Sequence, residues 1–424
     1  MLLKKFYVCL ILMVLYVKFV PFLGVFEEIG VYSGWFTSLF SSILSLSTIV
    51  LLLILINLFS DGPSGKMNKS FALMLLSGVI PLLFMNSGHW GLMFLTYEMS
   101  LIPVSMMILI SGKQPERLRA CRFILLYTVL FSVPFLLSLQ SIYSDTKCLS
   151  VLQLNLVVST HSMPFYCVVG VMFGFLVKIP MIFLHYWLPK AHVEASASGS
   201  ILLAGVLLKM GALGLFQLAY MLPLVQSSAF WDFLVCLSLW GSFVSALQAL
   251  LSSDMKIIIA FASVSHMNFS VAIFWTMNNL SLSSFMCFNY SHSMIASALF
   301  LLVTESYSRS NSRSVLINKG NLSAAQSKAS SYGLWAANMS LPPFVGFVAE
   351  ILGMICLGMT SLFTIVPVSL YVIFSAIYSS VNLVVLTHCK SSSALAVSVV
   401  KMGLPVFMMT VTPLLFTLSV KALT

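Results

Sequence analysis

Charged side chains are scarce in this sequence. Only 8% of its 424 residues are Asp, Glu, Lys or Arg, whereas 60% are hydrophobic. A soluble globular protein carries about 25% charged residues, so these few charges cannot cover a surface that faces water. The composition excludes a soluble fold and disfavours a catalytic domain on the water side. It predicts an all-α protein that crosses a membrane many times, because a spanning helix needs about 20 apolar residues.

Clustered cysteines and glycine-rich loops are also missing. None of the eight cysteines is spaced as Cys-x-x-Cys, which argues against a zinc site or an iron–sulfur cluster. The sequence contains no Gly-x-Gly-x-x-Gly and no Walker-type phosphate loop. We therefore expect this chain to hold no metal, nucleotide or redox cofactor of its own.

Apolar runs occupy most of the chain. Thirteen of them are long enough to be membrane spans, which predicts about 13 transmembrane helices in a single membrane domain over 1–424. The runs are 3–21, 38–59, 70–87, 90–111, 119–141, 163–187, 197–222, 229–251, 258–276, 282–305, 329–354, 358–386 and 394–420.

The net charge of +10 is distributed unevenly about these runs. Of the 21 basic residues, fifteen fall on the side of the N-terminus, two on the other side and four inside runs. Lys and Arg concentrate on the side from which a membrane protein inserts. The basic charge is thus a signal of topology and does not indicate nucleic-acid binding. No small-residue cleavage site follows the first run before Pro21, so we expect a first transmembrane helix there.

Titratable side chains lie inside several runs, where a charge costs about 2.5–3.5 kcal/mol on insertion scales. They are Glu98, Lys178, Lys209, His266, His292 and Glu350. Such groups, spaced through a helix bundle, can relay protons. Purely structural roles stay open as alternatives. Glu98 and Lys178 could form a structural ion pair, and Lys209 could snorkel to an interface. The two histidines could form hydrogen bonds between helices.

Prolines interrupt two of the predicted spans. Pro180 follows Lys178 by two residues, and the pair Pro342 and Pro343 precedes Glu350 on the eleventh run. Proline removes a backbone donor, and irregular backbone at membrane depth is tolerated only where protein or a wet cavity surrounds it. These positions therefore predict helix breaks beside titratable residues.

The two interrupted spans are the sixth and the eleventh, so they run in opposite directions. Paired broken helices in inverted halves are the sequence sign of an inverted-repeat transporter, although proline is common enough in membrane helices for coincidence to remain an alternative. We expect two inverted five-helix repeats, at about 70–222 and 229–386, followed by a C-terminal helix at 394–424.

Five ordered stretches resemble one known family. They are YEMSLIPVSMMILISGKQPERLRACRFILLYT (97–128), LVKIPMIFLHYWLPKAHVEASASGSILLAGVLLKMGALG (176–214), SSDMKIIIAFASVSHMNFS (252–270), SHSMIASALFLLVTESYSRSNSR (291–313) and NMSLPPFVGFVAEILGM (338–354). The family is that of the proton-pumping, antiporter-like subunits of respiratory complex I. Stretch 112–118 and the acidic Glu350 are most similar to its mitochondrial chain 4 members. The usual fold has 14 helices, so this chain would lack an N-terminal one.

The resemblance implies a role for each titratable residue. Glu98 matches the glutamate that modulates a lysine on the first broken helix, and Lys178 matches that lysine. Lys209 matches the next lysine along the membrane axis. The polar bridge toward the last site is matched by His266 and His292. Glu350 matches the terminal acid, which replaces a lysine of the sister subunits. Departures such as Ser196 and Ser293 remove no titratable residue of the pump.

The resemblance also implies a setting. The chain would be a subunit of the proton-translocating NADH:ubiquinone reductase in the mitochondrial inner membrane, multi-pass, with its N-terminus on the matrix side. Expected partners are the antiporter-like subunits 2 and 5, accessory subunits and lipids such as cardiolipin. NADH, FMN, iron–sulfur clusters and ubiquinone are expected in other subunits. The alternative is a subunit of an Mrp-type cation/proton antiporter, and a third reading is a structural spacer that has lost pumping.

Overall fold

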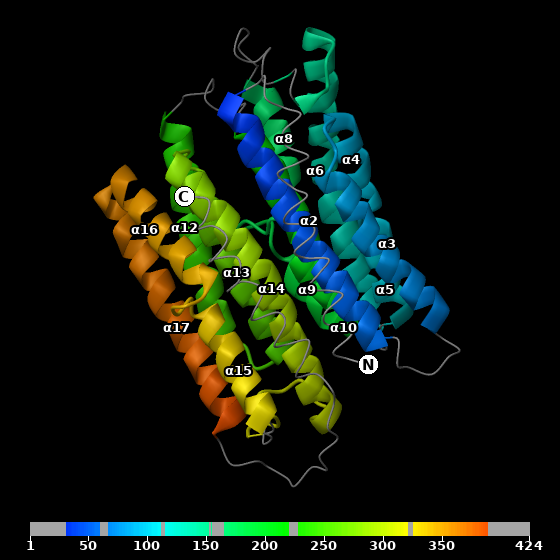
Figure 1. Ribbon diagram of the computed structural model, residues 1–424, viewed down its shortest axis with the longest axis vertical. Coiled ribbons are helices and arrows are strands. Elements are labelled where there is room, and N and C mark those ends of the chain that lie inside the picture. Colours follow the sequence, from blue (N-terminus) through cyan, green and yellow to red (C-terminus); the bar gives the residue numbers. More distant parts are fainter. Residues whose placement is uncertain are drawn as a thin grey trace. The chain divides into compact units, whose positions relative to one another are not determined.

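A computed structural model gives the architecture of the chain (Figure 1). It describes residues 31–59, 67–111, 115–151, 154, 165–219, 228–320 and 325–388. Across these ranges the regular elements are helices, and the only β-type pairing consists of two isolated bridges. The prediction of an all-α fold is confirmed.

The helices follow one another along the chain with short connections. In order they are α2 (Val31–Phe59), α3 (Met67–Met85), α4 (Trp90–Met99), α5 (Leu101–Ser111), α6 (Arg117–Thr146), α8 (Phe165–Lys178), α9 (Trp187–Glu194), α10 (Ala197–Leu202), α11 (Leu208–Leu218), α12 (Ser228–Leu251), α13 (Met255–Phe274), α14 (Asn279–Ser310), α15 (Ala325–Asn338), α16 (Val345–Thr360) and α17 (Ile365–Thr387). A π-helical turn, Leu203–Leu207, joins α10 to α11, and a 3₁₀ turn, Leu362–Thr364, precedes α17.

The predicted spans agree with these helices. In the part of the chain that the structure describes, eight helical segments are long and apolar enough to cross a membrane. Shorter apolar helices at Ser70–Met85, Phe165–Lys178 and Val345–Thr360 fill three further predicted spans. The first predicted run, 3–21, and the C-terminal helix predicted at 394–424 lie outside the described residues.

Both predicted helix breaks are present. α8 ends at Lys178 and α9 begins only at Trp187, so the interruption contains Pro180. α15 ends at Asn338 and α16 begins at Val345, with Pro342 and Pro343 between them. The physical cause is the one expected from the sequence, because proline supplies no backbone donor to the preceding turn.

The described helices group into two compact units, each considered by itself. The first contains α2 to α5, α6 from Cys121 onward, α8 and α11, and the second contains α9, α10 and α12 to α17. Grouping by contacts therefore places α9 and α10 with helices of the second predicted repeat. The inverted repeats themselves remain a prediction.

Aromatic packing and one small residue hold α8 in the first unit. The Phe175 ring of α8 lies 4.9 Å from that of Phe135 and 5.8 Å from that of Tyr97, centroid to centroid. α11 packs on α8 through Gly214, where an added Cβ would come within 2.2 Å of the Phe175 ring. The close approach requires glycine and positions the two helices that carry the buried lysines.

In the second unit, α13 packs against α12 and α14, while α17 packs on α12 and α16 packs on α14 (Figure 1). Most residues of α13 and α14 are buried. Their interiors nevertheless contain several polar side chains, among them His266, Asn268, Asn289 and His292. Burial of such groups is favourable only when they are hydrogen-bonded, so the centre of this unit is a polar site enclosed by apolar helices.

Candidate functional site

Lys178 is the last residue of α8 and is only 1% exposed. Its Nζ donates to the carbonyl oxygen of Tyr97 at 2.7 Å and to Oγ of Ser100 at 2.9 Å. It also lies 3.4 Å from the centroid of the Tyr97 ring. A cation at this place is stabilised by the ring face and by the negative end of the α8 dipole.

The acceptors for Lys178 come from a helix junction that the sequence reasoning missed. The predicted span 90–111 is divided at Ser100, where α4 ends and α5 begins. The carbonyl of Tyr97 accepts hydrogen bonds from both the Ser100 hydroxyl and Lys178. Pro103, which has no N–H to give to the preceding turn, was the available signal.

Glu98 does not form a close ion pair with Lys178. Arg309 and Glu305 form an ion pair at 2.6 Å, whereas no such contact within 4.0 Å joins Glu98 to Lys178. The Glu98 carboxylate hydrogen-bonds to Ser132 and interacts electrostatically with Lys178, and its buried Oε1 has no hydrogen-bond partner. The simple ion-pair alternative therefore does not describe this site, because a carbonyl and a hydroxyl hold the ammonium.

Lys209 lies in the first turn of α11 and is fully buried. Snorkelling to an interface is thus the wrong explanation for its position. The π-helical turn Leu203–Leu207 ends two residues before it, and such turns inside α-helices are often found at functional sites. The neighbouring Met210 places its sulfur 4.0 Å from Nζ of Lys178, so this turn of α11 adjoins the end of α8.

The centre of the second unit is a hydrogen-bonded chain around His266 of α13. Its Nδ1 lies 2.7 Å from the Tyr371 hydroxyl, and its Nε2 lies 3.1 Å from the Tyr378 hydroxyl. Both tyrosines belong to α17, and because they are seven residues apart they lie on one face of it. Both ring nitrogens of one histidine are therefore engaged by one helix.

Glu350 continues this chain on α16. The Tyr371 hydroxyl donates to Oε1 of Glu350 at 3.4 Å, and Ser340 also hydrogen-bonds to the carboxylate. Ser340 belongs to the segment between α15 and α16, so the helix break supplies a polar partner for the buried acid. On the other side, Nδ2 of Asn338 donates to the Tyr378 hydroxyl at 3.3 Å.

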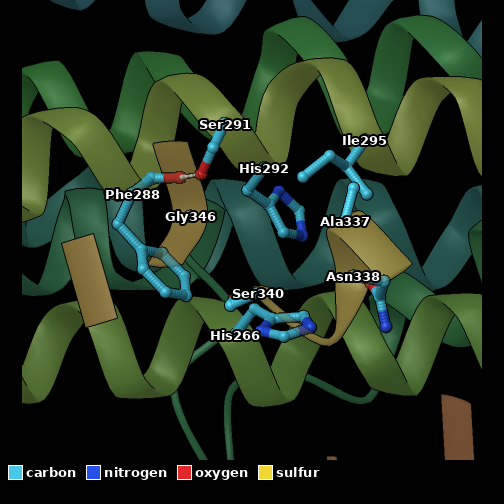
Figure 2. Close-up of a pocket in the computed structure, with 9 residues that line it drawn as sticks. All are labelled: His266, Phe288, Ser291, His292, Ile295, Ala337, Asn338, Ser340 and Gly346. Atoms are coloured by element: carbon cyan, nitrogen blue, oxygen red, sulfur yellow. Dashed lines mark hydrogen bonds between the residues drawn. The ribbon is translucent and has the colours of Figure 1, made fainter. Parts of the chain in front are cut away.

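His292 of α14 faces the same region across a small cavity (Figure 2). The rings of His266 and His292 are 5.9 Å apart, centroid to centroid. The space open to the centre of a water molecule is about 20 Å³, which exceeds the roughly 10–15 Å³ that one water needs. Its walls include Ser291, Asn338 and Ser340, which could satisfy a bound water.

The break at Pro180 is stabilised by an asparagine that the sequence analysis did not identify. Nδ2 of Asn268 donates to the carbonyl oxygen of Pro180 at 2.9 Å, and its Oδ1 accepts from the backbone N–H of Ile182 at 3.1 Å. Gly241 of α12 leaves space for this side chain, since a Cβ there would come within 2.8 Å of Oδ1. Asn268 lies two residues after His266 on α13.

The predicted site residues thus fall into two sets. Glu98, Lys178 and Lys209 lie in the first unit, and His266, His292 and Glu350 lie in the second. Tyr371 of α17 joins His266 to Glu350. The described residues contain no group of three or more His, Cys, Asp or Glu arranged to hold a metal ion. The arrangement suits the storage and transfer of protons, and the role of each residue remains a prediction.

Comparisons with known proteins identify the family of the chain. The family described as "NADH:quinone oxidoreductase/Mrp antiporter, TM" matches residues 87–377. NADH-ubiquinone oxidoreductase chain 4 of Albinaria caerulea is 32% identical over 355 residues, covering 84% of this chain and 80% of that one. The protein of the same name from Aedes aegypti is 37% identical over 291 residues, covering 68% and 64%.

Solved structures share the fold. A chain of respiratory complex I from Thermus thermophilus superimposes with a TM-score of 0.76 at 21% identity, covering 89% of this chain and 80% of that one. A chain of the Mrp complex from Dietzia sp. DQ12-45-1b superimposes with a TM-score of 0.78 at 16% identity, covering 88% and 42%. At these identities the likeness establishes architecture alone, whereas the sequence relatives indicate the branch of the family.

Proposed function

The chain belongs to the NADH:quinone oxidoreductase/Mrp antiporter transmembrane family, with NADH-ubiquinone oxidoreductase chain 4 proteins as its relatives, and from this we propose that it translocates protons as a membrane-arm subunit of respiratory complex I. The NADH:ubiquinone reductase activity belongs to the complex. This chain supplies a proton path whose titratable groups are Glu98, Lys178, Lys209, His266, His292 and Glu350.

The observation that carries the proposal is the binding of Lys178. A fully enclosed ammonium is held at the broken end of α8 by one carbonyl and one hydroxyl, with the Glu98 carboxylate beyond hydrogen-bond contact. Burial favours the neutral amine and a nearby carboxylate favours the ammonium. Movement of Glu98 relative to Lys178 therefore switches the lysine between holding and releasing a proton.

Several finer points belong to the same proposal. The chain lies in the mitochondrial inner membrane with its N-terminus on the matrix side. Its neighbours are the antiporter-like subunits 2 and 5 and accessory subunits, and cardiolipin fills gaps at its surface. It holds no redox group, so that NADH, FMN, iron–sulfur clusters and ubiquinone act in other subunits. The spacing of its cysteines and the lack of a phosphate-binding loop support this division of labour.

The second candidate is a subunit of a cation/proton antiporter, which the likeness to the Mrp complex chain favours. The main proposal is preferred because the relatives named above, at 32% and 37% identity, are chain 4 proteins, whereas the Mrp chain is 16% identical.

An experiment on the native assembly separates the two. The chain would be captured through an affinity tag from membranes solubilised in mild detergent, and the complex would be sealed into vesicles. We expect NADH:ubiquinone reductase activity to be captured with it, and NADH to drive proton movement at the same rate with sodium or potassium as the cation. Capture without reductase activity, together with sodium-dependent proton exchange, would establish the antiporter instead.

A further inference from the structure

We propose that Tyr371 is a proton-relay residue between His266 and Glu350, with Tyr378 fixing the second nitrogen of the same histidine. This rests on the proposed function and adds two side chains to its path. The carrying observation is the unbroken order of contacts: Asn338 to Tyr378 at 3.3 Å, Tyr378 to His266 at 3.1 Å, His266 to Tyr371 at 2.7 Å and Tyr371 to Glu350 at 3.4 Å.

The donors and acceptors in this chain impose a direction. Since the Tyr371 hydroxyl donates to Glu350, its only proton is used, and its oxygen can only accept from His266. Nδ1 of His266 must then carry a proton. When the histidine is an imidazolium, its second N–H donates to the oxygen of Tyr378, which also accepts from Asn338.

The transfer balances without any oxidant or reductant. The N–H bond at Nδ1 of the imidazolium breaks and its proton forms an O–H bond on Tyr371. The original O–H bond of Tyr371 breaks and its proton forms an O–H bond on the Glu350 carboxylate. A neutral histidine protonated at Nε2 and a neutral glutamic acid remain, and tyrosine is regenerated with its hydroxyl directed to Nδ1. The relay is reset when that hydroxyl rotates back toward Glu350, Glu350 releases its proton on the far side and Nδ1 of His266 takes up a new proton.

The two hydrogen bonds of Tyr371 differ in length. The longer one, to Glu350, is therefore the contact that determines when a proton can pass. The His266–Tyr371 contact of 2.7 Å is a full hydrogen bond, whereas the Tyr371–Glu350 contact of 3.4 Å is longer than the 2.5–3.0 Å usual for such bonds. A proton can cross only when α16 and α17 bring these oxygens closer. Both side chains are almost fully buried, so bulk water does not bypass them.

The relay is tested by Tyr371→Phe in the assembled complex. This variant keeps the ring, which stacks on Phe269 with centroids 4.5 Å apart, and removes only the bridging hydroxyl. The matched control is Ser379→Ala, which removes a buried hydroxyl of α17 that donates only to backbone carbonyls of its own helix. We expect proton translocation through this chain to fall about a hundredfold in the tyrosine variant, with normal assembly, and to be unchanged in the control.

The ratio of rates in H₂O and D₂O distinguishes a relay from a structural role. We expect this ratio to rise in Tyr371→Phe, because a hindered proton transfer then limits turnover. A slower rate with an unchanged ratio would overturn the relay, as would wild-type pumping. If Tyr371→Phe does not assemble, Tyr378→Phe is judged by the same two measurements, since it removes the acceptor for the Nε2 proton.

Glu350→Gln separates failure of this inference from failure of the proposed function. Loss of pumping in Glu350→Gln with wild-type pumping in Tyr371→Phe would overturn the relay and leave the proton path in place. Wild-type pumping in both variants would overturn the relay together with the assignment of Glu350 to the path.

Discussion

Single residues in the first unit show how a buried cation can be held without a carboxylate in contact. The Lys178 ammonium is bound by the Tyr97 carbonyl, the Ser100 hydroxyl and the face of the Tyr97 ring. These neutral partners stabilise the ammonium less than a paired carboxylate would. Under the proposed function, this weaker binding is what allows the proton to leave Lys178 when the electrostatic influence of Glu98 changes.

Ser100→Ala should slow proton translocation about tenfold or more without preventing assembly, because a hydrogen bond to a charged group contributes about 1.5–3 kcal/mol. The measurement is NADH-driven proton uptake by sealed vesicles, normalised to the amount of complex. Ser105→Ala is the matched control, since the Ser105 hydroxyl donates to the Ile102 carbonyl of its own helix and does not contact Lys178. Equal rates in the two variants would show that Ser100 does not bind the ammonium in a functional state.

For single residues, the sequence predicts the titratable side chains better than it predicts the side chains that hydrogen-bond to them. Charges are so rare that Glu98, Lys178, Lys209 and Glu350 can be singled out from the sequence alone. The structure buries the last three, whereas Glu98 is partly exposed. Tyr371 and Tyr378 could not be identified, because tyrosine is common in membrane helices and their contacts join residues more than 100 positions apart, from α17 to His266. Only the tertiary structure brings them together.

At the scale of helices, the breaks are stabilised by side chains from other helices. The Asn268 amide of α13 bonds to the Pro180 carbonyl and to the Ile182 N–H, so the irregular backbone near α9 has no unpaired groups at these two positions. The sequence predicted both proline breaks. The α4–α5 junction at Ser100 had a local signal in Pro103, which was missed. The π-helical turn before Lys209 could not be predicted, because it depends on packing rather than on local composition.

Replacing this asparagine should destabilise the second unit. Asn268→Leu leaves two buried backbone groups without partners, and each costs about 1–3 kcal/mol. We expect a lower temperature of thermal inactivation for the assembled complex. The control is Asn289→Leu, because Asn289 is also buried but its amide donates to Phe285 of its own helix. An equal fall in the inactivation temperature of both variants would contradict this. It would show that loss of any buried amide destabilises the unit, whether or not the amide bonds to the backbone beside Pro180.

Helix packing gives a second prediction at this scale. Gly214→Ala places a methyl group against the buried Phe175 ring, which is confined by Phe135 and Tyr97. Overpacking of this kind costs about 1–3 kcal/mol, so less of the chain should accumulate in the complex. Gly333→Ala in α15 meets no atom within 4 Å and should be neutral or slightly stabilising. Equal amounts of both variants, measured by quantitative immunoblot of the complex, would contradict this packing.

For the whole molecule, the distribution of basic residues predicts which ends of the helices face the matrix. Lys190 falls on the side of the N-terminus and Lys147 on the opposite side, and both are exposed in the structure. Cysteines introduced by Lys147→Cys and Lys190→Cys should react differently with a membrane-impermeant maleimide in mitoplasts. We expect Lys147→Cys to react in intact mitoplasts and Lys190→Cys only after permeabilisation.

The unsubstituted chain measures the background from native cysteines, such as the exposed Cys236. Reaction of both introduced cysteines from the same side would disprove the predicted topology. At this scale the sequence predicts most of the fold, because span number and orientation follow from hydropathy and charge. The sequence does not determine how the helices divide between compact units, since that depends on contacts between distant segments.

The most direct test of the central claim is the number of protons translocated per NADH oxidised, measured in sealed vesicles that contain the complex with Lys178→Met. Lys147→Met, which removes an exposed lysine outside the predicted spans, is the control. We predict that the Lys178 variant assembles and translocates fewer protons per NADH, whereas the control gives the wild-type number. A wild-type number in assembled Lys178→Met complex would contradict the proposal that this chain carries a proton path.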